Sequence, residues 1–244
     1  MQESFVDFPD PTEFPDSLDL VAVSAVDRNG IPLHATHPES IIAMTRYGTS
    51  YDPAVLMQAY RRGMFPMPLE VDGDAMAIGW WSPATRAVFY PDKIRITRSL
   101  RKSLRKFRVT FDTAFEQVVR QCGDPSRPQG WIDEDVINAY TEMFRQGHAH
   151  SVEVWNGKGD LVGGLYGVDV GGVFAGESMF HLERDASKVA LVHLAILLRD
   201  GQERVIDTQW MTEHLKSLGA VAMPRAEYIA LLRRLRDVPS IIWP

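Results

Sequence analysis

The segment "HSVEVWNGKGDLVGGLYGVDVGGVFAGESMF" (residues 150–180) decides the fold class of this chain. Its first part alternates polar and apolar side chains as far as Trp155, which is the period of a half-buried β-strand. The run "NGKGD" (156–160) is typical of a hairpin turn, and the glycine pair at 171–172 predicts a second turn. The segment therefore predicts three consecutive antiparallel strands.

The sequence on either side of this segment adds helices and further strands. Upstream, "GWWSPATRAVFYP" (79–91) predicts a strand, a turn and another strand. Three amphipathic helices are predicted between these regions, at 97–106, 112–123 and 133–148. Downstream, "DASKVALVHLAILLRDG" (185–201) predicts a helix and "RVIDTQW" (204–210) one more strand, followed by two C-terminal helices. We expect an α/β (α+β) fold with a mixed, mostly antiparallel sheet, in the element order of N-acetyltransferase-like (GNAT-type) acyltransferase domains.

Three parts of the chain are expected. Residues 1–40 are acidic, rich in proline and without sustained periodicity, which favours an extended, partly disordered leader. Residues 41–84 are expected to form a small N-terminal domain around a helix that Asp52 caps and that ends near Gly63. Residues 85–244 are expected to form the acyltransferase-like domain.

The composition of the 244 residues, 45% apolar and 24% charged, is ordinary for a globular protein. No apolar run reaches the roughly 18 residues that a membrane-spanning helix needs. The N-terminal stretch is acidic, unlike a signal peptide, and the single cysteine, Cys122, has no partner for an internal disulfide. We expect a cytoplasmic protein without a membrane segment.

The net charge of −6 comes from the first 50 residues, because residues 51–244 carry 24 charges of each sign. Within the neutral part, residues 92–108 place eight lysines and arginines against one aspartate. Such a segment either forms a solvated helix face or binds a polyanion. Four aromatic residues are able to stack on a base or sugar, or to pack in the core: Trp80, Trp81, Trp131 and Tyr140.

A carboxylate and an amide, Asp207 and Gln209, stand two residues apart at the end of the predicted strand 204–210, so strand parity places them on one side. Glu177 interrupts an apolar strand directly after Gly176, a residue that often marks a bulge. The alternatives are a loop after Ile206 and an edge strand with Glu177 in water. If the two strands are neighbours, these polar groups converge, an arrangement that suits a cationic ligand or an amine nucleophile.

Other chemistries have weak support in the sequence. His148 and His150 are more simply explained as the end of a helix and the start of a strand than as zinc ligands. No metal is expected. No nucleophile elbow is present, and Cys122 has the position of an interior helix residue. The junction "FHLERDASKV" (180–189) lacks the glycine-rich loop that would cradle a pyrophosphate, so we expect neither coenzyme A nor another cofactor.

From about Asp52 to its end, the chain resembles the leucyl/phenylalanyl-tRNA–protein transferase family. The motifs that carry this resemblance are "LMQAYRRGMFP", "WWSP", "GHAHSVEVW", "LVGGLYGV", "GESMF", "ASK", "VIDTQ" and "HLKSLGA". It implies transfer of Leu or Phe from aminoacyl-tRNA to the α-amine of an N-terminal Arg or Lys, which marks the acceptor protein for degradation by the N-degron pathway.

The resemblance also implies roles for individual residues. The catalytic and acceptor-binding groups fall on Glu177, Asp207 and Gln209, with Gln209 positioning the amine and Glu177 holding the basic acceptor side chain. The donor side-chain pocket falls on Leu165, Phe174, Met179, Leu194 and Ile206. Independently of the resemblance, the aromatic residues Trp131 and Tyr140 are candidates for further substrate contacts. The resemblance places tRNA contacts on Arg98 and Arg105, and the basic segment adds Arg101, Lys102 and Lys106 as candidates.

The sequence departs from the family pattern at "YGTSYDP" (47–53) and at Met67, where a tryptophan is usual, and both bear on donor preference. Thr208 replaces a common cysteine and is expected by parity to face away from the site.

The sequence leaves two alternative functions open, an acyltransferase with another acyl donor and a tRNA- or N-degron-binding module. A monomer is expected.

Overall fold

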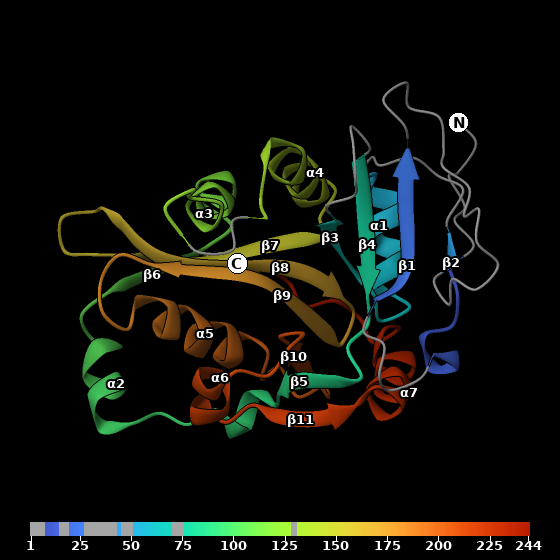
Figure 1. Cartoon of the computed structure of the whole chain (residues 1–244). Helices are drawn as coiled ribbons and strands as arrows, with labels where there is room; N and C mark the ends of the chain where they lie inside the picture. The colour runs from blue at the N-terminus through green and yellow to red at the C-terminus, as the bar shows by residue number, and fades with distance from the viewer. Residues whose placement is uncertain (1–7, 15–19, 27–42, 45–50, 70–75, 128–130) are drawn as a thin grey trace. The chain divides into compact units, whose positions relative to one another are not determined.

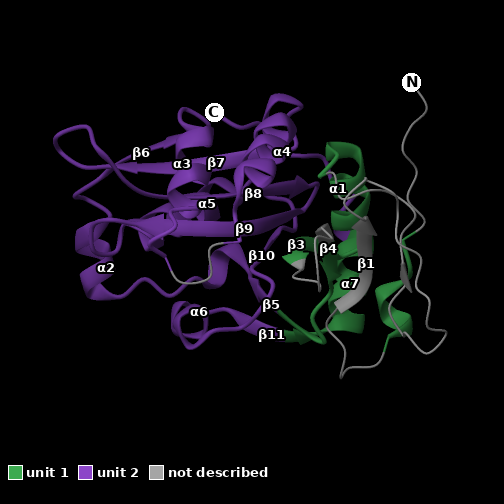
Figure 2. Ribbon diagram, turned by 45° about the horizontal axis from the view of Figure 1, so that its top comes forward, with its two compact units in different colours: residues 1–86, 223–234 green, residues 87–222, 235–244 purple. Residues whose placement is uncertain are grey.

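The computed structural model describes residues 8–14, 20–26, 43–44, 51–69, 76–127 and 131–244. The chain divides into two compact units, which Figure 2 colours separately. Unit 1 comprises Met1–Arg86 and Met223–Arg234, and unit 2 comprises Ala87–Ala222 and Leu235–Pro244. The unit boundaries fall inside or beside three elements: β5 (Thr85–Phe89), β11 (Val221–Pro224) and α7 (Arg225–Leu235).

Unit 1 contains a sheet of strand order β2-β1-β4-β3. The strands of this sheet are β1 (Leu20–Val26), β2 (Ala43–Met44), β3 (Phe65–Leu69) and β4 (Met76–Trp81). Unit 1 also contains η1 (Pro11–Glu13) and α1 (Pro53–Tyr60). The start of α1 agrees with the sequence, because the Asp52 carboxylate accepts the backbone N–H of Ala54 at 2.8 Å.

Two features of unit 1 differ from the expected domain plan. Strand β1 lies inside the segment 1–40, for which the sequence favours an extended, partly disordered leader; most of that segment lies outside the described residues. Residues 223–234 group with unit 1, whereas the sequence assigns them to the domain 85–244. Sequence alone did not indicate this return of the chain, because nothing in the local pattern of α7 specifies its partner.

Unit 2 is built on a seven-stranded sheet of order β11-β5-β10-β9-β8-β7-β6 (Figure 1). Its remaining strands are β6 (Arg108–Phe111), β7 (Ala149–Trp155), β8 (Leu161–Val170), β9 (Val173–His181) and β10 (Val205–Asp207). Its helices are η2 (Pro91–Lys93), α2 (Arg98–Ser103), α3 (Phe115–Cys122), α4 (Glu134–Arg145), α5 (Ala186–Leu197) and α6 (Glu213–Leu218). None of the helices in the described part of the chain is long and apolar enough to cross a membrane.

The three predicted strands of residues 150–180 are confirmed as the antiparallel meander β7-β8-β9. The first turn forms as its sequence requires, because the Asn156 side chain accepts the backbone N–H groups of Lys158 and Asp160 and Gly159 has a φ of +87°. Helix α5 then returns the chain so that β10 pairs parallel with β9, which confirms the predicted mixed, mostly antiparallel sheet.

Helices cover both faces of the central strands of this sheet. Helix α5 packs against β7 and β8 on one face, while α3 and α4 lie together on the opposite face (Figure 1). The core on the α5 side contains buried residues of the meander and of the helix, such as Val152, Leu165, Phe174 and Leu194. The polar groups of interest lie where β9 and β10 run beside each other in this framework.

Candidate active site

A β-bulge places Glu177 at the centre of the candidate site. Tyr166 of β8 pairs with Ser178, but the next residue, Gly167, pairs with Gly176, so Glu177 is the extra residue on β9. The bulge that the sequence predicts beside Gly176 is therefore confirmed. It also shifts the alternation of β9, so that Phe174 and Met179, five residues apart, line the same cavity.

The turn after β10 places Gln209 beside this bulge. The strand ends at Asp207, and Gln209 has a φ of +56°, in the left-handed region. The buried Asp207 carboxylate stabilises this turn by accepting the backbone N–H of Gln209 at 2.9 Å. The carbonyl of Gln209 in turn accepts the N–H of Ala87 on β5 at 2.9 Å, so the turn is held from two sides.

This turn corrects the prediction made for Thr208. Strand parity predicts that Thr208 faces away from the site, but it lines the same cavity as Gln209. Parity does not apply here, because the strand has already ended and the backbone changes direction at Gln209. The Thr208 hydroxyl donates to the carbonyl oxygen of Ala87 at 3.2 Å.

The Glu177 carboxylate joins three elements. Its Oε1 accepts the Gln209 side-chain Nε2–H at 3.1 Å, and its Oε2 accepts the Tyr140 hydroxyl at 3.1 Å. Tyr140 comes from α4, which covers the sheet on the side opposite α5, and its side chain is fully buried. The structure thus brings Glu177, Gln209 and Tyr140 together, with Asp207 acting on the backbone of Gln209.

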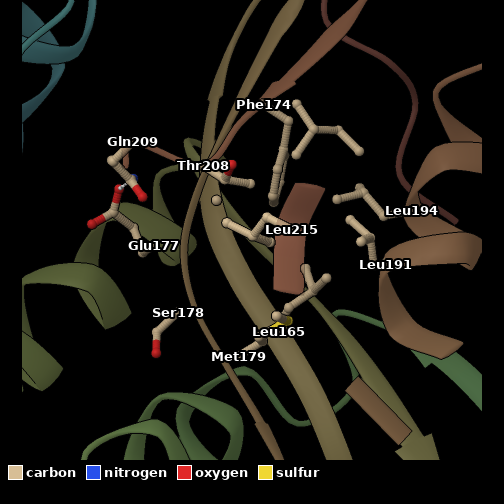
Figure 3. Close-up of a pocket in the computed structure, with 12 residues that line it drawn as sticks. Leu165, Phe174, Glu177, Ser178, Met179, Leu191, Leu194, Thr208, Gln209 and Leu215 are labelled. Carbon is tan, nitrogen blue, oxygen red and sulfur yellow. Dashed lines mark hydrogen bonds between the residues drawn. The ribbon is translucent and has the colours of Figure 1, made fainter. Parts of the chain in front are cut away.

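An apolar cavity of about 140 Å³ adjoins these polar groups. Figure 3 shows Glu177 and Gln209 on one side of it and apolar side chains of the meander, α5 and α6 on the other. All five residues that the resemblance assigns to the donor pocket line it: Leu165, Phe174, Met179, Leu194 and Ile206. An engineered cavity of about 150 Å³ with a similar lining admits benzene, so this one has the size of a single Leu or Phe side chain.

Several cavity residues were missed from the sequence. Leu191 lies three positions before Leu194, so the helical period would have placed both on one face of α5. Leu215 on α6 gives no such signal, because its contact with the cavity depends on how two segments pack. Gly176 and Ser178 flank the bulge and also belong to the lining.

Two groups near the bulge, Tyr166 and Cys122, have pKa values above their usual ranges. Burial, followed by the negative charge of Glu177, raises the pKa of Tyr166 well above its usual value. Burial likewise raises the pKa of the Cys122 thiol to about 11, which agrees with its predicted place inside a helix. Cys122 therefore stays a thiol at neutral pH and lacks the thiolate that a cysteine nucleophile needs.

Comparison of the amino-acid sequence with known families identifies the family of the chain. The family model described as leucyl/phenylalanyl-tRNA protein transferase matches residues 88–233, and the model of that family's N-terminal domain matches residues 49–84. The chain belongs to the leucyl/phenylalanyl-tRNA–protein transferase family. The family match covers the bulge, the turn after β10 and all the cavity residues described above.

Relatives in the transferase family are similar over most of their length. The leucyl/phenylalanyl-tRNA–protein transferase of Afipia carboxidovorans is 46% identical, over 77% of this chain and 83% of its own. Those of Aromatoleum aromaticum and Azoarcus sp. are each 48% identical, over 79% and 82% of this chain and 80% and 83% of theirs. The structure of L-PGS from Bacillus licheniformis matches with a TM-score of 0.36 and 12% identity, over 62% of this chain and 64% of that one. This score is too low to identify a fold, and the GNAT-type label stays a prediction.

Trp131 and the candidate tRNA-contacting residues lie outside the cavity lining. Trp131 is half-buried just before α4 and is absent from the lining. The predicted tRNA-contacting residues lie on α2 or in the turn after it and are all exposed: Arg98, Arg101, Lys102, Arg105 and Lys106. Lys106 forms an ion pair with Glu183, and Ser103 of α2 donates to Asp185 at 3.0 Å. These contacts fix α2 to the segment that leads from β9 into α5.

The candidate site combines hydrogen-bond acceptors with an apolar cavity. Among the described residues, no group of three or more His, Cys, Asp and Glu side chains is arranged to hold a metal ion. His150, one of the two histidines considered from the sequence, contacts the Asp112 carboxylate through Nδ1 at 2.7 Å. The arrangement suits an amine that meets an apolar acyl group, with oriented acceptors beside the reacting atoms.

Proposed function

We propose that this chain transfers Leu or Phe from aminoacyl-tRNA to the α-amine of proteins that begin with Arg or Lys. The observation that carries the proposal is the hydrogen-bonded pair Glu177 and Gln209 at the side of a cavity with the size of one Leu or Phe side chain. The chain's membership of the transferase family supports the same reaction. The alternatives of another acyl donor or of a binding module have no comparable support.

The reaction is the aminolysis of an activated ester. The α-amine nitrogen forms a bond to the ester carbonyl carbon, the bond from that carbon to the terminal ribose oxygen of the tRNA breaks, and the proton of the amine ends on the ribose oxygen. The ester is already activated, so the protein's contribution is to hold the two reactants in line and to orient the amine.

Gln209 is proposed to orient the amine. An ionised carboxylate has no donor, so Gln209 presents its NH₂ group to Glu177 and directs its Oε1 elsewhere. That oxygen is proposed to accept an N–H of the incoming amine. Asp207 is a positioning residue, because it accepts the backbone N–H of Gln209 and thereby fixes the turn.

Glu177 is proposed to hold the positively charged side chain of the acceptor. Its oxygens accept hydrogen bonds from Tyr140 and Gln209, and an ionised carboxylate pairs strongly with a cationic donor. A guanidinium or ammonium group of the acceptor would form charge-assisted hydrogen bonds with this carboxylate. The charge of Glu177 would favour basic N-terminal residues, because a hydrogen bond between two charged groups is stronger than one to a neutral group.

The exposed cations of α2 and the following turn are proposed to contact phosphates of the tRNA. Within the described part of the chain, no carboxylate forms an ion pair with Arg98, Arg101, Lys102 or Arg105. Their mutual repulsion would be relieved by a nucleic-acid backbone. We also propose that the protein acts as a cytoplasmic monomer.

The decisive experiment is label transfer from radiolabelled Leu-tRNA or Phe-tRNA to a peptide that begins with Arg. A matched peptide with an acetylated N-terminus lacks the nucleophile and should remain unlabelled, while a peptide that begins with Glu should accept much less label. Failure to label the Arg peptide, with the peptide still binding, would refute the transfer reaction and leave a binding module. Acetyl transfer from acetyl-CoA to the same peptide would instead support the other acyltransferase.

A further inference from the structure

The C-terminal segment inserts a tryptophan beside the apolar cavity. The ring of Trp243 stacks on that of His150, with centroids 4.0 Å apart and an interplanar angle of 2°. Its Nε1–H donates to Asp169 Oδ2 at 3.4 Å. These contacts come from β7 and β8, so the tryptophan lies across two strands of the meander.

The segment that carries Trp243 is itself anchored. Arg204, just before β10, donates to the carbonyl oxygen of Pro239 at 2.7 Å, and the backbone N–H of Gly172 donates to Leu235 at 2.8 Å. Ile241 is 9% exposed and belongs to the core of unit 2. In contrast, Ile242, the residue before Trp243, is 94% exposed. Trp243 itself is partly buried and packs against this core.

Trp243 contacts the wall of the cavity through Phe174. Their ring centroids are 5.7 Å apart, and the rings are tilted by 42°. Phe174 is a cavity-lining residue and pairs across the sheet with Asp169, the acceptor of the Trp243 hydrogen bond. The tryptophan therefore supports Phe174 from outside the cavity, and it is not itself part of the lining.

Gly167 leaves the space in which the Phe174 ring packs. A Cβ added at Gly167 would lie 2.5 Å from Cε1 and 2.7 Å from Cζ of Phe174, so the ring packs directly over the glycine backbone. Gly167 and Trp243 together limit where the Phe174 ring can lie. The depth of the cavity on this side follows from that position, because the ring forms its wall.

We infer that Trp243 and Gly167 determine donor specificity by positioning Phe174. The inference rests on the proposed function, in which the cavity holds the Leu or Phe side chain of the aminoacyl-tRNA. Removing the indole leaves space into which the Phe174 ring can move, and the cavity becomes longer. A longer cavity favours the larger donor side chain, so Phe gains relative to Leu.

The test is a series of substitutions at Trp243, namely W243F, W243L and W243A, each compared with the exposed control I242A. For each protein, kcat/KM is measured with Phe-tRNA and with Leu-tRNA as donor and one Arg-starting peptide as acceptor. We expect the Phe/Leu ratio to rise as the side chain becomes smaller, by ~10-fold for W243A, while W243F stays within ~3-fold of the original protein and I242A is unchanged. A loss of stability alone would lower both rates together and leave their ratio unchanged.

A second measurement separates the inference from the proposed function. Binding of phenylalaninamide and leucinamide is followed by ligand-observed NMR, which needs no transfer activity. If the original protein transfers no label, the proposed function fails, but a shift of binding toward phenylalaninamide in W243A still supports the role of Trp243. The inference would be overturned if the W243L and W243A proteins fold but keep the Phe/Leu ratios of the original protein in both transfer and amide binding. It would also be overturned if the original protein fails to bind either amide.

Discussion

Gln209 donates its side-chain amide to Glu177 across two neighbouring strands, at a distance of 3.1 Å. Two irregularities make this contact possible. Glu177 is the extra residue of a bulge in β9, and Gln209 lies in a left-handed turn directly after β10. In regular strands both side chains would follow the sheet alternation, so the pair exists because each strand departs from regular geometry beside the other.

Replacing Gln209 by alanine should lower kcat/KM by about 100-fold, because the amine loses the acceptor that orients it. The substitution leaves the α2 cations unchanged, so the affinity for tRNA should stay the same. Single-turnover transfer from Leu-tRNA and filter binding of the tRNA measure the two effects separately. Gln202→Ala is the matched control, because Gln202 is exposed in the loop before β10, and it should retain full activity. A Q209A protein with unchanged transfer would remove Gln209 from the mechanism.

Enlarging a side chain inside the cavity should discriminate between the two donors. Leu194 is fully buried and lines the cavity, so Leu194→Phe reduces the space left for the donor side chain. We expect kcat/KM for Phe-tRNA to fall at least ~10-fold more than that for Leu-tRNA.

The matched control for this change lies on the same helix. Ile196 is 54% exposed, so Ile196→Phe adds the same aromatic ring to α5 outside the cavity. It should leave both donors unaffected. Equal losses for Leu and Phe in the L194F protein would show that this cavity does not hold the donor side chain.

The residues of this site show which features a sequence predicts. The adjacency of β9 and β10 was predictable, because a helix between two strands returns the chain in a known sense. The bulge was predictable from Gly176 inside an apolar strand. The orientation of Thr208 was predicted wrongly, because parity holds only within a strand and β10 ends one residue earlier.

Other features depend on packing between segments distant in the chain, and the sequence carries no local signal for them. Leu215 reaches the cavity only because α6 lies against it, and Trp243 contacts Phe174 from 69 positions away. The same limit applies to α7, most of which groups with unit 1 although it follows unit 2 in the chain. Periodicity identifies which face of an element is apolar, but it does not specify the partner of that face.

The buried thiol of Cys122 predicts a loss of stability at alkaline pH. Its pKa in the folded protein is raised to about 11 from an ordinary value near 9, so the folded state retains the proton while the unfolded state releases it. Stability should therefore be unaffected below about pH 9 and should fall as the pH rises toward 11.

Urea denaturation at pH 8 and pH 10 measures this difference, and Cys122→Ala should reduce it because alanine has no proton to release. The same variant should retain transfer activity, since the thiol takes no part in the reaction. A C122A protein with the same loss of stability between the two pH values would assign the effect to other groups.

Charge reversal on the basic segment should weaken tRNA binding in a salt-dependent way. Arg98 and Arg105 are exposed. If they contact tRNA phosphates as proposed, the double change to glutamate removes two such contacts. The slope of log K against log salt concentration should then become less steep by ~1.4 to 1.8, since each contact contributes ~0.7 to 0.9. Arg145→Glu is the control, because Arg145 is exposed on α4 and pairs there with Glu142. An unchanged slope in the double variant would exclude these two arginines from the tRNA interface, whereas a weaker affinity with an unchanged kcat would assign them to binding alone.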